Sequence, residues 1–118
     1  MEDDDENPVA FSKSIVADYF DQADLTFKQM DEYLEKQDLK NISKLGHFLK
    51  GSSATLGLTK LKDSCEKLQH YGDRLDEAGH NRVSDSQVSL RNCKKTIEQA
   101  RREFKEVEDI LQPFYQDD

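Results

Sequence analysis

The segment 45–57 places a histidine, a lysine and a glycine at helical spacing. In a helix successive side chains turn by about 100°, which puts His47 roughly 200° from the apolar Leu45 and toward solvent. Lys50 and Gly51 follow one turn later on the same face. A neutral imidazole is a nucleophile, and an ammonium group can neutralise charge on an anion. These residue types at this spacing are what a phosphoryl acceptor requires.

A glycine at position 51 weakens the helix that carries it. Glycine inside a helix costs about 1 kcal/mol relative to alanine, so it is kept for packing or for function. Because Gly51 faces outward with His47, we interpret it as clearance for an approaching partner rather than as a close helix contact. We interpret Lys50 as neutralising the transferred group rather than as an ordinary solvated lysine.

Four segments with helical periodicity must position this face. They cover approximately residues 12–36, 39–56, 59–75 and 85–113. Their predicted core positions are Val16, Phe20, Ala23, Phe27, Met30 and Leu34; Ile42, Leu45, Leu49, Ser52 and Leu56; Leu61, Cys65, Leu68, Gly72 and Leu75; and Leu90, Cys93, Ile97, Ala100, Phe104, Val107, Leu111 and Phe114. No stretch alternates as a strand does. Short connections between amphipathic helices predict an all-α fold, an antiparallel four-helix bundle.

The expected helix ends follow from turn and cap residues. Gly57 stops the second segment, because glycine is favoured just past a helix C-terminus. Thr59 is a candidate N-cap for the third segment, and Ser84 or Asp85 for the fourth. Pro113 is expected to end the fourth segment.

Composition limits the class of protein. The chain has 118 residues, enough for one small domain, and a net charge of −8. Five of the first six residues are acidic, and we predict that residues 1–8 form a disordered acidic tail before a bundle domain at 9–118. Beyond those six residues, 17 basic residues stand against 20 acidic ones with no basic stripe, which argues against nucleic acid as a partner.

The expected compartment follows from the termini and the cysteines. There is no apolar run near membrane length, and the acidic N-terminus is unlike a signal peptide. Cys65 and Cys93 fall on apolar helix positions and are interpreted as core residues in a reducing compartment, with no metal or redox motif. We expect a cytoplasmic protein, with the nucleus as a second location.

Residues 47–57 resemble the signature of histidine-containing phosphotransfer (HPt) proteins, H-x-L-K-G-[SA]-[SA]-x-x-[LI]-[GA], at every position. The resemblance extends over nearly the whole chain after the acidic residues, and the chain is most similar to fungal phosphorelay intermediates. The resemblance implies that His47 accepts a phosphoryl group from the receiver domain of a hybrid histidine kinase and passes it to a response regulator receiver domain. It implies a monomeric carrier in stress signalling that needs no cofactor of its own, with Mg²⁺ on the receiver.

The resemblance also implies a wider site. Gln69 on the third helix is expected to hydrogen-bond the imidazole or the phosphoryl group, although it can equally be a boundary residue. Ile15, Tyr19 and Phe48 are expected to form a hydrophobic docking patch for the receiver. The small Ser52, which lets a neighbouring element approach, is counted with them. The alternative for Ile15 and Tyr19 is that they widen the buried face of the first helix.

Three further positions are weaker candidates for a role in the site. Related proteins resemble a pattern that has a basic residue near the position of Asp73. Arg74 lies next to Asp73, so the sequence leaves open whether the third helix supplies a second cation to the site. His70 and His80 lack metal-ligand spacing with His47 and are interpreted as structural or solvated.

Two other functions were considered for a chain of this kind. The phosphoacceptor domain of a sensor kinase resembles a histidine followed by an acidic residue, whereas Phe48 follows His47 here. A helical adaptor that binds receiver-like partners without chemistry explains the helices, but not a histidine, a lysine and a glycine on one exposed face. The chain also lacks a nucleotide-binding glycine motif, which excludes kinase activity of its own.

Overall fold

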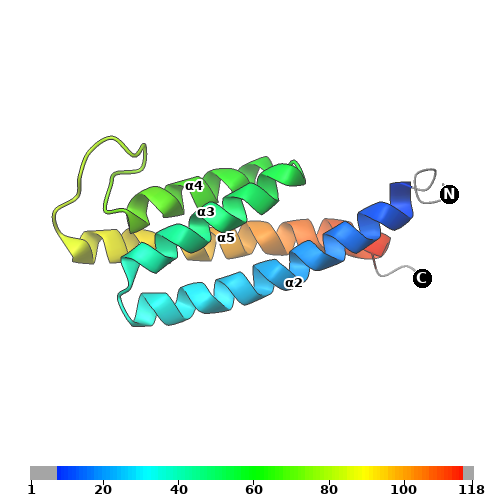
Figure 1. Ribbon diagram of the computed structural model, residues 1–118, viewed down its shortest axis with the longest axis horizontal. Coiled ribbons are helices and arrows are strands. Elements are labelled where there is room, and N and C mark those ends of the chain that lie inside the picture. The colour runs from blue at the N-terminus through cyan, green and yellow to red at the C-terminus, as the bar shows by residue number, and fades with distance from the viewer. Residues whose placement is uncertain (1–7, 116–118) are drawn as a thin grey trace.

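In a computed structural model the chain forms a bundle of long helices (Figure 1). The structure describes residues 8–115, with side chains for 14–112. The helices are α2 (Pro8–Glu35), α3 (Leu39–Thr55), α4 (Thr59–Gly72) and α5 (Ser86–Tyr115). Apart from one isolated bridge between Leu75 and Arg82, residues 8–115 contain no β-structure. The predicted all-α four-helix bundle is confirmed, and the acidic residues 1–7 lie outside the described part.

The four helices pack as a square in cross-section. α3 packs against α2 and α4, and α5 packs against the same two helices from the other side, so that α3 and α5 lie on a diagonal. The connections 36–38 and 56–58 are short and force antiparallel neighbours, whereas α4 and α5 are joined by the longer segment 73–85. α2 and α5 are the longer helices, and the α3–α4 hairpin lies along them (Figure 1). No helix in the described residues is both long and apolar enough to cross a membrane.

The core forms where the apolar stripes of the helices meet. Phe104 of α5 lies at its centre, with ring centroids 6.0 Å from Tyr19 and 5.6 Å from Phe27. Cys65 and Cys93 are fully buried free thiols, which confirms their interpretation as core residues. Burial raises the pKa of each thiol to about 12, so both stay protonated at neutral pH.

Two glycines set the distance between α3 and α4. A Cβ on Gly72 would lie 2.7 Å from the backbone nitrogen of Ser43 and 2.8 Å from the carbonyl oxygen of Leu39. A Cβ on Gly46 would lie 3.1 Å from both the Cys65 carbonyl oxygen and the Gln69 nitrogen. Only residues without a side chain permit this approach, which fixes the register of α4 against α3 and thereby the placement of the site.

The core line of α3 differs from the predicted one. Ile42 and Leu49 are buried as expected, but Gly46 and Ser53 complete the line, while Leu45, Ser52 and Leu56 are only partly buried. Leu45 and Leu56 still pack against the core, as predicted, but the prediction missed Gly46 and Ser53. Gly46 is buried by its backbone contact with α4, and the buried Ser53 hydroxyl is 3.0 Å from the Tyr19 hydroxyl.

The helix ends confirm some of the expected signals and correct others. Gly57 adopts a left-handed φ of 73° just after α3, as expected of a C-terminal glycine. Asp85 accepts a hydrogen bond from the Gln87 N–H at the start of α5. Leu58 rather than Thr59 is the N-cap of α4, with no side-chain cap, because Thr59 is already helical. The backbone of α5 continues past Pro113, since the φ of proline suits a helix.

Candidate functional site

The exposed face of α3 presents His47 to solvent. The helix starts at Asp38, whose side chain accepts a hydrogen bond from the Asn41 N–H at 3.2 Å. Ile42 and Leu49 are fully buried and anchor the opposite side of the helix in the core. His47 and Gly51 are therefore exposed, and Lys50 is half-buried beside them. The expected outward face is confirmed in its geometry.

The space above Gly51 is open. A Cβ built at this position meets no atom within 4 Å, in contrast to the contacts of 3.1 Å at Gly46 on the same helix. Gly51 therefore has no packing reason within the bundle. The role of Gly51 as clearance for a partner that approaches His47 is compatible with this open space and stays a prediction.

The imidazole of His47 and the ammonium group of Lys50 make no polar contact with the described side chains. Among the side chains at 14–112, none forms a hydrogen bond or an ion pair with the imidazole of His47 or with the ammonium group of Lys50. An anion bound at the imidazole would thus meet the ammonium group of Lys50, which has no existing ion pair that must first be broken. This arrangement suits a phosphoryl group whose negative charge must be neutralised.

Gln69 of α4 lies at the level of the site. Its backbone nitrogen is one of the atoms that a Cβ on Gly46, the neighbour of His47, would contact at 3.1 Å. Its side chain is half-buried at the edge between the two helices. The α3–α4 register thus brings Gln69 beside the histidine, and its hydrogen bond to the imidazole or to a phosphoryl group stays a prediction.

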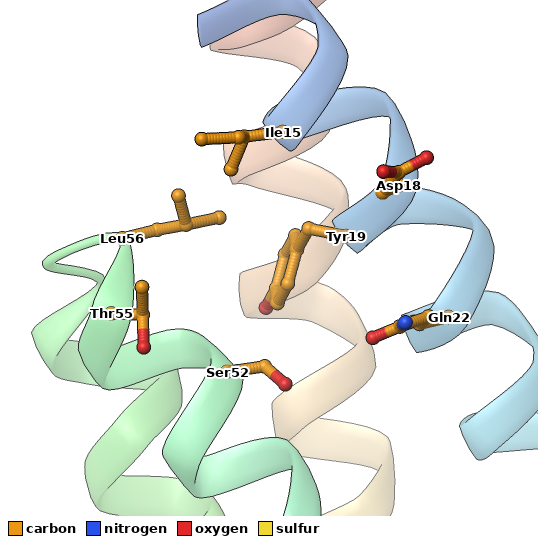
Figure 2. A pocket seen from close by; sticks show the side chains of 7 residues that line it. All are labelled: Ile15, Asp18, Tyr19, Gln22, Ser52, Thr55 and Leu56. Atoms are coloured by element: carbon orange, nitrogen blue, oxygen red, sulfur yellow. The ribbon is translucent and has the colours of Figure 1, made fainter. Parts of the chain in front are cut away.

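A groove runs between α2 and α3 next to this face. Figure 2 shows Ile15, Asp18, Tyr19 and Gln22 from α2 on one side, and Ser52, Thr55 and Leu56 from α3 on the other. The side chains of Ile15 and Leu56 point toward each other across it, as do those of Gln22 and Ser52 (Figure 2). Because Ser52 directly follows Gly51, the groove begins beside the open space at the histidine.

Tyr19 is buried and does not form part of an exposed docking patch, which corrects that expectation. Only 4% of Tyr19 is exposed, and its hydroxyl is 3.0 Å from that of Ser53. Burial raises its pKa to about 12. The ring lies at the bottom of the groove because its phenol has found a partner inside the bundle. The alternative, that Tyr19 widens the buried face, is the one that the structure bears out.

The rest of the predicted docking patch is only partly brought together. Ile15 and Ser52 line the groove, whereas Phe48 lies outside it, one turn earlier on α3, with 48% of its surface exposed. The Ser52 hydroxyl donates to the Phe48 carbonyl oxygen at 3.4 Å. Sequence reasoning missed Asp18, Gln22, Thr55 and Leu56 as groove residues. The spacing of Asp18 and Gln22, one turn apart beside Ile15, was the available signal.

The remaining candidates have structural roles away from this face. The Nδ1 atom of His70 is 2.8 Å from the Glu77 carbonyl oxygen, and its ring fills the space next to Gly79. Arg74 donates to the carbonyl oxygen of Ser84 and so holds the connection 73–85. His80 is exposed. In the part of the chain that the structure describes, no three His, Cys, Asp or Glu side chains gather as metal ligands.

Comparison with known proteins finds a family and several relatives. A family model described as "Hpt domain" matches residues 14–110. The chain is 42% identical over 116 residues to multistep phosphorelay regulator 1 of Schizosaccharomyces pombe, an alignment that covers 98% of this chain and 39% of that protein. It is 46% identical over 72 residues to phosphorelay intermediate protein YPD1 of Candida albicans, which covers 61% of this chain and 39% of the relative.

Solved structures with the same fold as this chain are also found. The structure of Saccharomyces cerevisiae Ypd1, a histidine phosphotransfer signaling protein crystallised with the receiver domain of its downstream response regulator Ssk1, superposes with a TM-score of 0.80 at 32% identity. That match covers 98% of this chain and 87% of the other. A crystal structure of yeast YPD1 also matches with a TM-score of 0.80, at 30% identity. The chain spans only about two fifths of the length of the first two curated relatives.

Proposed function

This chain belongs to the Hpt domain family, and from that premise we propose that it is a histidine phosphotransfer intermediate of a multistep phosphorelay. His47 accepts a phosphoryl group from an aspartyl phosphate on the receiver domain of a hybrid histidine kinase. It then passes the group to an aspartate on the receiver domain of a response regulator. The observation that carries the proposal is the exposed imidazole of His47, with Lys50 and the open position of Gly51 on the same face of α3.

The transfer is a substitution at phosphorus. The lone pair of a ring nitrogen of His47 forms the new N–P bond. The P–O bond to the aspartate of the donor breaks, and its electron pair leaves with the carboxylate. Lys50 neutralises charge on the phosphoryl oxygens during the exchange, and Gln69 accepts a hydrogen bond from the imidazole N–H through its amide oxygen or donates one to the phosphoryl group through its amide nitrogen. The return of the group to a second receiver follows the same steps in reverse order.

The carrier supplies positioning and little else. α3 is anchored in the core at Ile42 and Leu49, so its exposed imidazole is presented from a rigid element. Mg²⁺ and most phosphoryl ligands belong to the receiver in this proposal, and the carrier needs no nucleotide. The groove beside Gly51, with Ile15 and Ser52 on its walls, is the proposed docking surface, together with Phe48. We place the protein in the cytoplasm, with a second population in the nucleus.

Transfer from purified receivers tests the proposal directly. A panel of receiver domains is labelled with radioactive acetyl phosphate in the presence of Mg²⁺, freed of the small donor, and mixed with the wild-type protein or with His47→Gln. The expected result is label on the wild type alone. That label should be lost in acid and kept in alkali, as an N–P bond requires.

Two controls sharpen this result. His70→Gln and His80→Gln should retain the label, since neither histidine lies on the exposed face of α3. Label on the His47→Gln variant would refute the assignment of the phosphoacceptor. Receivers that bind the wild-type protein without transferring label would leave the fold as described and favour the adaptor function.

A further inference from the structure

The exposed face of α3 carries lysines both before and after His47 along the helix. Lys40 lies two turns before His47 on the same face, Lys44 lies one turn before it, and Lys50 lies one turn after it. No acidic residue occurs between Asp38 and Asp63, whereas the chain as a whole carries 25 of them. These lysines are dispersed in the sequence, and the helical period gathers them on one side of α3.

These lysines do not stabilise the helix that carries them. Lys40 lies in the first turn, where the positive end of the helix dipole disfavours cations. Lys40 and Lys44 are one turn apart and repel each other. Among the described side chains neither lysine has an ion-pair partner, whereas Lys67 pairs with Glu77 and Lys105 with Asp109. The positive charge of this face is therefore directed outward.

The neighbouring helix α2 exposes acidic side chains. Asp18, Asp21 and Asp24 of α2 are all exposed, and Asp18 lines the groove itself. α2 and α3 are neighbours in the bundle (Figure 1), so exposed acidic side chains of α2 lie next to the helix that carries the lysines, while the α3 side of the groove is uncharged. A partner approaching His47 meets an electrical asymmetry that favours one orientation.

We propose that Lys40 and Lys44, together with Lys50, steer the phosphorylated face of a receiver domain onto His47. This inference rests on the proposed phosphotransfer function and adds the residues that govern encounter. An aspartyl phosphate is an anion, and a Mg²⁺ site is built from carboxylates, so the donor presents a negative surface. The lysines attract that surface along α3, and the acidic face of α2 repels it. The result is a faster and oriented encounter without any contact of Lys40 or Lys44 with the reacting atoms.

The test removes two charges from this face and compares an equal change elsewhere. The variant is Lys40→Gln with Lys44→Gln. The control is Lys94→Gln with Lys95→Gln, whose lysines are exposed on α5, diagonally opposite α3. The receiver of the panel that transfers fastest to the wild type serves as donor. Single-turnover transfer is measured over a range of receiver and NaCl concentrations, and circular dichroism checks that both variants are folded.

The α3 variant should lose about tenfold in the second-order rate constant at low salt, at the lower end of what steering contributes. Its rate at saturating receiver should stay unchanged, and it should converge with the wild type at high salt because screening removes the difference. The α5 control should match the wild type throughout. Equal behaviour of the two variants, or a loss confined to the saturating rate, would overturn the proposal.

Two further outcomes are distinct from these. Binding to vesicles containing phosphatidylserine that is lost only in the α3 variant, with unchanged transfer, would assign the lysines to a membrane surface and overturn the proposal. If no receiver labels the wild-type protein, the carrier function itself is refuted. This outcome is distinguishable because the wild type is measured before any lysine is changed.

Discussion

Gly51 offers a substitution in which stability and activity should move in opposite directions. In Gly51→Ala the new Cβ meets no atom within 4 Å, so nothing offsets the gain in helix propensity. That gain is about 1 kcal/mol, which for a domain of this size corresponds to about 4 °C in the melting temperature. Gly51→Gln should retain most of this increase, because glutamine is also a good helix former.

Transfer should fall as the side chain grows. Gly51 lies one turn from His47 on the same exposed face, where the proposed receiver must approach. A displacement of the reacting atoms by about 1 Å can cost about 10²-fold in rate. We therefore expect a loss of that order for Gly51→Gln and a smaller one for Gly51→Ala. The assay is single-turnover transfer from a phosphorylated receiver, with thermal unfolding measured on the same preparations.

Gly46→Ala is the matched control on the same helix. Its Cβ would lie 3.1 Å from two backbone atoms of α4, and such overpacking typically costs about 1–3 kcal/mol. Its melting temperature should fall, which is the opposite sign from Gly51→Ala. A stabilised Gly51→Gln variant with undiminished transfer would refute the clearance argument. A Gly51→Ala variant that loses stability would show that the residue packs against something after all.

Three further predictions concern the packing that supports the site. Gly72→Ala should lower the free energy of unfolding by at least about 2 kcal/mol, because its Cβ would lie 2.7 Å from the α3 backbone, and urea denaturation will measure the loss. Tyr19→Phe leaves the buried Ser53 hydroxyl without its partner and should cost about 1–3 kcal/mol in the same assay, whereas Tyr19→Phe combined with Ser53→Ala should recover part of the loss. Burial raises the pKa of Tyr19, Cys65 and Cys93 to about 12 in the fold, so these groups ionise at lower pH in the unfolded chain. Stability should therefore be complete below about pH 9 and decline as the pH rises toward 12, and a flat profile between pH 8 and pH 10.5 would contradict this.

The buried stripes of α2, α4 and α5 could be predicted because large apolar side chains recur at the helical period. Phe20 and Phe27 of α2, Leu68 of α4 and Phe104 of α5 are all buried as expected. Burial of such side chains dominates helix packing, so the pattern and the energy point to the same face.

The buried positions of α3 could not all be predicted in the same way. Gly46 has no side chain that a hydrophobic pattern can register, and its burial results from the approach of α4. Ser53 is polar, and it is buried because Tyr19 of another helix satisfies its hydroxyl. Both facts depend on contacts between elements, which the local period of one helix does not contain.

The candidate site also has one part that could be predicted from the sequence and one part that could not. The outward face of His47 and Gly51 follows from the period of a single helix, and the structure places both on it. The groove requires the relative placement of two helices, and its polar walls at Asp18 and Gln22 look like any solvated helix face in the sequence. The sequence left open whether Tyr19 is exposed or buried, because the contact that buries it comes from Ser53 of another helix.

The connection 73–85 offers a place for engineering that leaves the chemistry untouched. It lies at the end of the bundle opposite the start of α2 and the end of α5 (Figure 1). Its tip, including His80 and Asn81, is exposed, and exposed loop tips tolerate insertions well. A fluorescent protein spliced into this tip would stay outside the α3–α4 face and outside the groove. The fused chain should thus show where the protein lies in a living cell without obstructing the exposed face of α3.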